Sequence, residues 1–303
     1  MNVTVTGLLS VSDMKISVII PTLNAQNNIR ALLESLFSQT VKAEIIIVDS
    51  SSEDLTKEIC STFQELKLME IERKDFDHGR TRDLALRESK GDFIVFLTQD
   101  ALPSDEYCLE KLLSSFEDER VAAVYGRQLP YEDAPEHEKL IRDFNYPEVS
   151  HVFFEKDIGT CGTRAYFFSD VFSAYRRSAY EKTGGFDHPV RTNEDMLMSA
   201  KLLHAGYGVA YNAEAKVFHS HRFTLKEEYE RYKKIGQVLK EYEGRLYGSK
   251  DNREALKLVF HVLGGLLRKG RIISVFVFLF HMGARYLGSR MGRSGIDTKK
   301  IEK

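Results

Sequence analysis

Short apolar runs alternate with helix-like segments through the first 125 residues, and this alternation constrains the fold more than any other feature. The runs cover residues 16–20, 45–48, 68–71, 93–97 and 121–125. Helical patterns fill the intervals, at residues 28–37, 55–66, 81–89 and 106–116. Because short, mostly apolar runs are typical of strands buried on both faces, the sequence predicts an α/β fold. We expect a doubly wound, mostly parallel sheet with helices on both faces.

The overall composition excludes several classes of protein. A chain of 303 residues with 43% hydrophobic residues can bury the core of a large domain. Its net charge of −2 gives no basic field, so no nucleic-acid partner is expected. Cys60, Cys108 and Cys161 form no Cys-x-x-Cys pair, which indicates free thiols in a reducing cytoplasm. Residues 1–14 lack the features of a secretory signal and are predicted to be an N-terminal extension.

Later segments complete the main domain, which is predicted to span residues 15–242. Residues 131–163 are irregular and rich in Glu, His, Pro and aromatic residues, so we expect a long loop that faces a ligand. Residues 167–180 and 193–204 have helical patterns, and residues 208–211 have the pattern of another strand.

Residues 243–303 are predicted to form a basic amphipathic helical tail. Its central part has one acid, Glu254, against eight basic residues interleaved with apolar ones: Arg253, Lys257, Arg268, Lys269, Arg271, Arg285, Arg290 and Arg293. Such segments bind anionic membrane surfaces. The longest uncharged run, residues 272–284, is shorter than the roughly 20 residues that cross a bilayer. We therefore expect an interfacial anchor; the alternative is a pair of helices that pack on the main domain or on a second subunit.

Polar side chains follow three of the predicted strands. Thr22 and Asn24 follow the first strand, Asp49 the second and Asp100 the fourth. Open α/β sheets bind ligands at the carboxyl edge of their strands, so we expect these groups to gather at one rim. An aspartate in such a position can also simply start a turn.

Four motifs, in this order, resemble those of the family 2 inverting glycosyltransferases, which have the GT-A fold. They are residues 16–24 (ISVIIPTLN), residues 46–56 (IIVDSSSEDLT), Asp100 and residues 193–196 (NEDM). The resemblance covers roughly residues 15–242 and implies a nucleotide-sugar donor that carries dTDP or UDP.

The resemblance implies that the first two strand ends hold the nucleotide. Pro21, Thr22 and Asn24 would line the base and ribose pocket, and Asp49 would accept a hydrogen bond from the base or ribose. A carboxylate suits the imide N–H of uracil or thymine. The alternative role for Asp49 is a helix cap.

Residues 76–83 (FDHGRTRD) are the next candidate for nucleotide contacts. Gly79 would allow close approach of the backbone, and Arg80 and Arg82 lie beside a helix start, which favours phosphate. An arginine fork suits a diphosphate or a base carbonyl. The resemblance implies that Arg82 and Asp83 face the nucleotide; a solvated surface pair is the alternative for the two arginines.

Most members of the family carry Asp-x-Asp after the fourth strand, whereas this chain has Thr98-Gln99-Asp100. Asp100 would then be the main protein oxygen for a divalent cation, Mg²⁺ or Mn²⁺, and Gln99 would belong to the nucleotide pocket. The resemblance makes His219 the first choice of imidazole ligand and His221 the second. The alternative for either histidine is a plain hydrogen-bonding role in a loop.

Glu194 and Asp195 open the helix predicted over residues 193–204. The resemblance implies that Asp195 is the catalytic base, which takes the proton of the acceptor hydroxyl, and that Glu194 holds the acceptor or orients the loop. A helix cap is the alternative. Donor or acceptor contacts are expected from Phe168, Ser169, Ser173, Gly185 and Phe186.

Residues 76–82 and 98–101, with residues 167–174 (FFSDVFSA), resemble the bacterial rhamnosyltransferase branch of the family. This implies transfer of L-rhamnose from dTDP-β-L-rhamnose to a lipid-linked or polysaccharide acceptor in cell-surface glycan synthesis. The enzyme would be peripheral at the cytoplasmic membrane face, with a homodimer as one arrangement. The alternatives are a UDP-hexose donor, a sugar-1-phosphate nucleotidyltransferase and a catalytically degenerate membrane-bound assembly partner. A nucleotidyltransferase would need a Gly-rich loop where residues 21–24 have no glycine.

Overall fold

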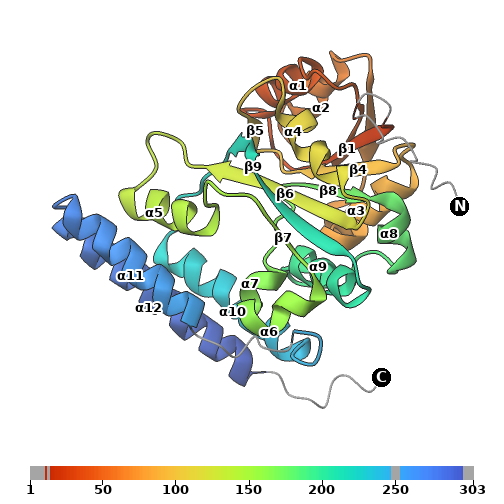
Figure 1. Ribbon diagram of the computed structural model, residues 1–303. Coiled ribbons are helices and arrows are strands. Elements are labelled where there is room, and N and C mark those ends of the chain that lie inside the picture. Colours follow the sequence, from red (N-terminus) through yellow and green to blue (C-terminus); the bar gives the residue numbers. More distant parts are fainter. Residues whose placement is uncertain (1–10, 12–13, 247–252, 296–303) are drawn as a thin grey trace, which may run out of the picture.

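A nine-stranded sheet runs through the described part of this computed structural model, which comprises residues 11, 14–246 and 253–295 (Figure 1). The strand order is β3-β2-β1-β4-β8-β6-β9-β5, and β7 pairs with β9. Neighbours along β3-β2-β1-β4 are parallel, as are β6 and β9, whereas β8 is antiparallel to both β4 and β6. The strands are β1 Ile16–Thr22, β2 Glu44–Asp49, β3 Leu66–Glu70, β4 Phe93–Leu97, β5 Leu102–Pro103, β6 Val121–Leu129, β7 His151–Phe153, β8 Phe172–Arg176 and β9 Gly208–Phe218.

Helices cover both faces of the sheet, as the sequence predicts. Along β1, Val18 and Ile20 belong to the core cluster that includes side chains of α1 and α4, whereas Ile19 belongs to the other cluster, which includes side chains of α3 and α9. Successive side chains of a strand point to opposite faces, so burial on both sides explains the continuous apolar runs. The α-helices are α1 Ile29–Phe37, α2 Thr56–Ser61, α3 His78–Arg87, α4 Cys108–Leu113, α5 Glu136–Asn145, α6 Ile158–Cys161, α7 Thr163–Tyr166, α8 Arg177–Lys182, α9 Glu194–His204, α10 Leu225–Glu241, α11 Arg253–Arg268 and α12 Ile272–Ser294.

The helix predicted over residues 167–180 is wrong, because this segment forms β8 and the first part of α8. Phe172 and Ala174 pack on one face of the sheet and Tyr175 on the other, which is the period of two that a strand requires. β6 and β9 also continue past their predicted ends to Leu129 and Phe218. These extensions carry residues toward the site.

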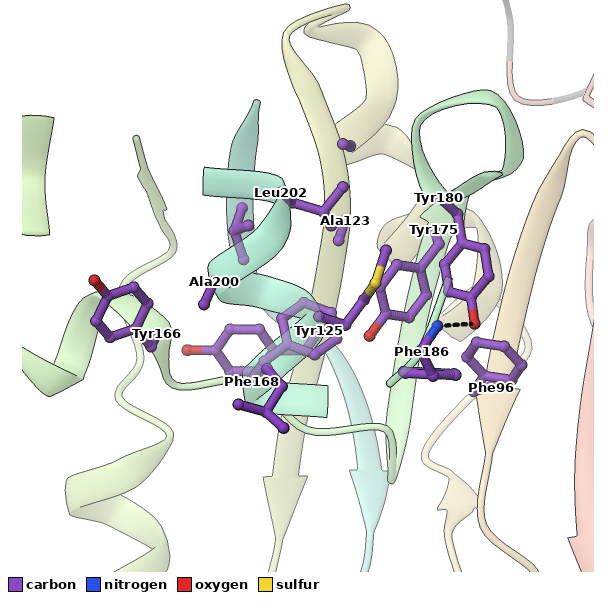
Figure 2. Packing of buried hydrophobic residues seen from close by; sticks show 14 of the residues in the cluster. Phe96, Ala123, Tyr125, Tyr166, Phe168, Tyr175, Tyr180, Phe186, Ala200 and Leu202 are labelled. Carbon is purple, nitrogen blue, oxygen red and sulfur yellow. Dashed lines mark hydrogen bonds between the residues drawn. The ribbon is translucent and has the colours of Figure 1, made fainter. Parts of the chain in front are cut away.

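An aromatic cluster fills the face of the sheet that α9 covers (Figure 2). The rings of Tyr125 and Phe168 lie 5.1 Å apart between centroids, and those of Tyr175 and Tyr180 lie 5.4 Å apart. The Phe186 N–H donates to the Tyr180 hydroxyl at 3.2 Å, which is the bond drawn in Figure 2. The cluster therefore fixes β8 and the loop after α8, and both carry predicted site residues.

The last three helices form a layer beside α5, with α11 and α12 along one side of the molecule (Figure 1). Leu140 and Ile141 of α5 pack with Val262, Leu266 and Phe278 of this layer. The tail thus packs one of its faces on the main domain, which is the alternative that the sequence left open. The opposite face stays exposed.

α12 has the length and apolar composition of a membrane-crossing helix, judged by those two properties alone. It is nevertheless attached to the charged helix α10. Arg285 is 7% exposed and donates through Nη2 to Glu228 Oε1 at 2.5 Å. A Cβ at Gly288 would lie 2.3 Å from the Tyr229 carbonyl oxygen, so the two backbones approach as closely as glycine permits.

Candidate active site

The ends of β1 and β2 are joined through the Asp49 carboxylate, which is completely buried. Its Oδ2 accepts hydrogen bonds from Thr22 Oγ1 at 3.1 Å and Ser52 Oγ at 2.6 Å. Ser52 Oγ in turn accepts from the Asn24 N–H at 2.8 Å. Asp49 therefore fixes the shape of this rim. The sequence left a helix cap as the alternative role for Asp49. At the start of α2, however, the Thr56 N–H donates to the carboxylate of Asp54.

Three non-glycine residues beside the predicted site have a left-handed backbone. Among the described residues, positive φ angles outside glycine occur at Asn24 (51°), Ser51 (61°) and Asn193 (61°). This conformation is uncommon for residues with a side chain and persists where the surroundings hold it. Asn24 Oδ1 accepts from the Glu53 N–H at 2.9 Å, so the two rim loops hold each other in place.

Gln99, which follows β4, binds the loop after β1. Its Oε1 accepts from the Leu23 N–H at 2.7 Å, and its Nε2 donates to the Leu23 carbonyl oxygen at 3.1 Å. Pro21 lies within β1 opposite Val48 of β2. These contacts hold the end of β4, and Asp100 next to it, against the predicted nucleotide pocket.

The two arginines of the 76–83 segment have different surroundings. Asp77 caps α3 by accepting from the Arg80 N–H at 2.9 Å, and Arg80 is exposed. Arg82, in contrast, is 4% exposed. The fork that the sequence suggested is therefore split between solvent and the protein interior.

Gly79 and Asp83 contact the loop after α8. A Cβ at Gly79 would lie 2.9 Å from Phe186 Cβ, and a Cβ at Gly185 would lie 3.2 Å from Asp83 Oδ1. Asp83 also accepts from the Tyr180 hydroxyl. These four predicted site residues therefore form one packed contact between α3 and that loop.

The buried Arg82 guanidinium lies among three acids, Asp170, Glu194 and Asp195, which we call the carboxylate cluster. Its Nη1 donates to Glu194 Oε1 at 2.9 Å, and its Nε lies 4.0 Å from Asp170 Oδ2. The Asp170 N–H donates to Asp195 Oδ2 at 3.2 Å. α9 begins at Glu194, so its first turn delivers two of the three acids.

The cluster shifts the ionisation of its members. Burial, reinforced by the charges of Glu194 and Asp170, raises the pKa of Asp195 well above its ordinary value. Burial likewise raises the pKa of Asp170 to about 6, although Arg82 opposes the shift. A carboxylate with a raised pKa is a stronger base once it is ionised, which suits proton removal near neutral pH.

Buried hydroxyl groups hold the Asp170 carboxylate in place. Its Oδ1 accepts from Ser173 Oγ at 2.6 Å and from the Tyr175 hydroxyl at 2.9 Å. Ser173 is completely buried and Phe168 is 4% exposed, so both support the site from inside the core. Asp170 Oδ2 has no hydrogen-bond partner among the described residues.

Asp100, His219 and His221 form a triad whose ligand atoms all lie within 4.8 Å of one another. Asp100 Oδ2 lies 3.6 Å from His219 Nε2 and 3.8 Å from His221 Nδ1. Burial opposes ionisation of Asp100, but the contact with His219 outweighs it and holds the pKa of Asp100 below its ordinary value. Burial lowers the pKa of both histidines, that of His221 to about 4, so both rings are neutral and offer lone pairs at pH 7.

Gln128 orients the first of these histidines. Its Oε1 lies 2.9 Å from His219 Nδ1, which places the proton on Nδ1 and leaves Nε2, the atom facing Asp100, as the lone-pair donor. A divalent cation fits this set of one carboxylate and two imidazoles, provided that a phosphate and water supply further oxygens.

A continuous chain of contacts joins the triad to the carboxylate cluster. Gln128 binds His219 through Oε1 and donates from Nε2 to Ser169 Oγ at 2.9 Å. Ser169 precedes Asp170, whose N–H binds Asp195. The structure therefore brings the predicted metal ligands and the predicted base to one site.

Sequence reasoning missed three residues of this network: Asp170, Gln128 and Arg142. Arg142 Nη1 donates to Gln128 Oε1, and its Nε donates to Glu138 Oε1 at 3.0 Å. Asp170 lies inside the 167–174 motif, where a helical assignment hid its place before a strand. Gln128 and Arg142 carried no local signal, because their roles depend on partners far away in the sequence.

Comparison with known proteins agrees with this geometry at the level of the fold. The solved structure of a mannosyltransferase from Pyrobaculum calidifontis, in complex with GDP-Man and Mn²⁺, superposes with a TM-score of 0.63. The superposition covers 96% of this chain and 88% of the mannosyltransferase chain, and the two sequences are 16% identical. The fold is therefore of the GT-A type.

Sequence comparison identifies the family. The chain is 43% identical over 221 residues to the O-antigen chain rhamnosyltransferase RfbN of Salmonella typhimurium, covering 72% of this chain and 70% of that protein. It is 44% identical over 191 residues to the O-antigen chain rhamnosyltransferase WbaN of Salmonella anatum, covering 63% of this chain and 60% of that protein. The model of glycosyl transferase family 2 matches residues 17–184, more than half of the chain. This chain is therefore a member of glycosyl transferase family 2.

Proposed function

We propose that the chain transfers L-rhamnose from dTDP-β-L-rhamnose, with inversion, to a lipid-linked or polysaccharide acceptor in the synthesis of a cell-surface glycan. The observation that carries this proposal is the 43% identity to an O-antigen chain rhamnosyltransferase over 221 residues. The buried carboxylate cluster beside a cation-binding triad supports it, because an inverting transfer needs a base and stabilisation of the leaving diphosphate.

In the proposed mechanism, Asp195 takes the proton of the acceptor hydroxyl as that oxygen attacks the anomeric carbon. Its raised pKa favours this role. Glu194 and Arg82 hold the first turn of α9 in place, and Asp170 orients Asp195 through its backbone N–H. Inversion in a single displacement requires no covalent intermediate.

Asp100 and His219, with His221 as a further ligand, would hold Mg²⁺ or Mn²⁺. Such a cation would neutralise the negative charge that develops on the leaving diphosphate. Pro21, Asn24 and Gln99 would border the nucleotide. Thr22 and Asp49 would act on it mainly by shaping the rim, because both are buried and hydrogen-bonded to each other.

We also propose that the exposed face of α11 and α12 attaches the enzyme to the cytoplasmic surface of the membrane, with residues 15–242 as the catalytic domain. Ile273, Phe276 and Phe280 are 81%, 59% and 67% exposed. The basic residues of these helices complement anionic headgroups. The buried Arg285–Glu228 pair holds α12 on the domain, which favours a helix lying at the interface over one crossing the bilayer.

The test is a donor panel. The full chain is incubated with dTDP-rhamnose, UDP-glucose or UDP-N-acetylglucosamine, with Mg²⁺ or Mn²⁺, while thermal stabilisation and release of nucleoside diphosphate are measured. We expect stabilisation and slow hydrolysis with dTDP-rhamnose. Stronger stabilisation and faster hydrolysis with a UDP-sugar would show that the donor is that UDP-sugar and not dTDP-rhamnose. The absence of hydrolysis or transfer with all donors would favour a non-catalytic assembly partner.

A further inference from the structure

A cavity of about 340 Å³ lies between α5, α10, α12 and the loop after β9. We call it the α12 cavity. His221 lines it, so the cavity begins at the triad that faces the donor diphosphate in the proposed function. Ser274 and His281 of α12 also line it. The cavity therefore extends from the predicted reaction centre to the C-terminal helices.

The charged side chains that line the α12 cavity already have partners within the described residues. Glu136 binds Lys269 at 2.9 Å, and Arg222 binds Asp133 at 2.6 Å. Glu138 binds Arg142 and Glu228 binds Arg285. Because three glutamates and one arginine line the cavity, it suits a neutral ligand better than a phosphate.

The wall nevertheless offers polar atoms to such a ligand. Glu228 is 3% exposed, and its Oε2 has no hydrogen-bond partner among the described residues. A buried acceptor without a partner is costly, and a ligand hydroxyl can satisfy it. Histidine rings, the Ser274 hydroxyl and the apolar faces of Phe223 and Val277 complete the wall. Hydroxyl groups on a compact apolar frame, as in a sugar, match this mixture.

The cavity is connected to the predicted base. Glu138 in its wall binds Arg142 at 3.0 Å, and Arg142 binds Gln128. Gln128 then binds Ser169, next to Asp170 and its contact with Asp195. A series of hydrogen-bonded side chains thus links the wall of the cavity to the carboxylate cluster.

The cavity also lies beside the apolar face of α12. Ser274 follows the exposed Ile273 by one residue, a rotation of about 100° around the helix axis. A lipid held against the Ile273 face could place its head group in the cavity without leaving the membrane surface.

We propose that the α12 cavity binds the neutral sugar part of a lipid-linked acceptor. This inference rests on the proposed function, because it assigns the acceptor subsite of the same reaction. α12 would then have two roles, with one face on the membrane and the adjacent face on the acceptor sugar.

The test compares Ser274→Trp, which fills the cavity, with Ser294→Trp, the same change at an exposed position near the end of α12. Radiolabelled dTDP-rhamnose is added to the full-length enzyme and to solvent-extracted lipid-linked saccharides from cells that make the glycan. Label in the lipid fraction measures transfer, and free labelled rhamnose measures donor hydrolysis. Flotation with anionic vesicles measures membrane binding.

We expect Ser274→Trp to reduce transfer by about tenfold or more while donor hydrolysis and flotation stay unchanged, with Ser294→Trp equal to the wild type. Donor hydrolysis also reports that the variant is folded. Wild-type transfer by Ser274→Trp, or an equal loss in Ser294→Trp, would overturn the inference. A wild-type enzyme that neither hydrolyses the donor nor labels the lipid would instead overturn the proposed function itself.

Discussion

Arg82 Nη1 donates a hydrogen bond to Glu194 Oε1 at 2.9 Å, although 112 positions separate the two residues in the chain. Both side chains are buried, so the pair is shielded from solvent and salt. A buried ion pair often contributes little net stability, but removal of one partner leaves an uncompensated charge. The contact therefore serves mainly to fix the first turn of α9, where the predicted base lies.

Asp195→Asn should slow transfer strongly, because an amide cannot accept the acceptor proton. We expect the rate to fall by about 10² to 10⁴, the usual contribution of a general base. Stabilisation by dTDP should persist, since the hydrogen bonds of Asp195 go to Asp170 and Met196 and not to the residues of the β1–β2 rim. Asp92→Asn, an exposed matched change, should behave as the wild type. Wild-type turnover by Asp195→Asn would remove Asp195 from the mechanism.

Asp170→Asn should flatten the dependence of stability on pH. A carboxyl whose pKa is raised on folding from 3.8 to about 6 binds its proton more tightly in the folded state. Its contribution to stability is therefore complete below pH 3.8 and is lost as the pH rises through 6, at about 1 kcal/mol per pH unit. Asparagine keeps an oxygen for Ser173 and Tyr175 but cannot titrate.

The measurement for Asp170→Asn is thermal unfolding between pH 4.5 and 7. The wild type and Asp92→Asn should lose stability over this range more steeply than Asp170→Asn. Parallel curves for all three proteins would show that Asp170 ionises as it does in water.

Gln128→Leu should weaken the predicted metal site without removing a ligand. The change removes the acceptor that fixes the tautomer of His219, and loss of such a partner typically lowers metal affinity about 10- to 100-fold. The half-saturating Mn²⁺ concentration for donor hydrolysis should rise accordingly. Gln128→Glu keeps an acceptor for His219 and should stay close to the wild type. EDTA should stop hydrolysis by all three proteins, and added Mn²⁺ should restore it.

The sheet was predictable because its signal is local. Residues 45–48 of β2 and residues 93–97 of β4 are continuous apolar runs, and burial on both faces imposes that pattern on the residues themselves. β8 was missed because its five residues are flanked by further aromatic and small residues that mimic a helical repeat. Its strand conformation depends on pairing with β4 on one side and β6 on the other, and the local sequence pattern does not reveal these partners.

The site was predictable only in part, for the same physical reason. Asp100, Asp195 and His219 lie next to the ends of predicted strands or helices. At these three residues the family motif and the position in the predicted fold indicate the same role. Gln128 and Arg142 act through partners that only the fold brings near. The buried carboxylate cluster is likewise a product of tertiary structure, so its pKa shifts have no counterpart in the sequence.

Phe276→Asp with Phe280→Asp should release the enzyme from membranes. Both rings are more than half exposed, and each buried phenyl group contributes about 1.5 to 3 kcal/mol to membrane binding. In flotation with anionic vesicles, the wild type should rise and the double variant should stay in the dense fraction. Val149→Asp, at another exposed apolar position, is the control and should float. If the double variant floats like the wild type, this face does not bind the membrane. The remaining role for it would be contact with a second subunit, and sedimentation would detect that dimer.

Point changes are preferable here to deletion of the tail. Without α11 and α12, Leu140 and Ile141 of α5 would lose their cover, and Glu228 would lose Arg285. A truncated chain could therefore aggregate for reasons unrelated to membranes.

Gly288→Ala should destabilise the protein, because the α10–α12 crossing has no room for a methyl group. The added Cβ would lie 2.3 Å from the Tyr229 carbonyl oxygen, so one helix must move, at a cost of about 1 to 3 kcal/mol. Gly283→Ala in the same helix is the matched control, since nothing lies within 4 Å of its Cβ position. That change should be neutral or stabilising by up to about 1 kcal/mol through helix propensity. Thermal unfolding should show opposite or clearly unequal shifts, and equal shifts would mean that α12 does not pack on α10 in solution.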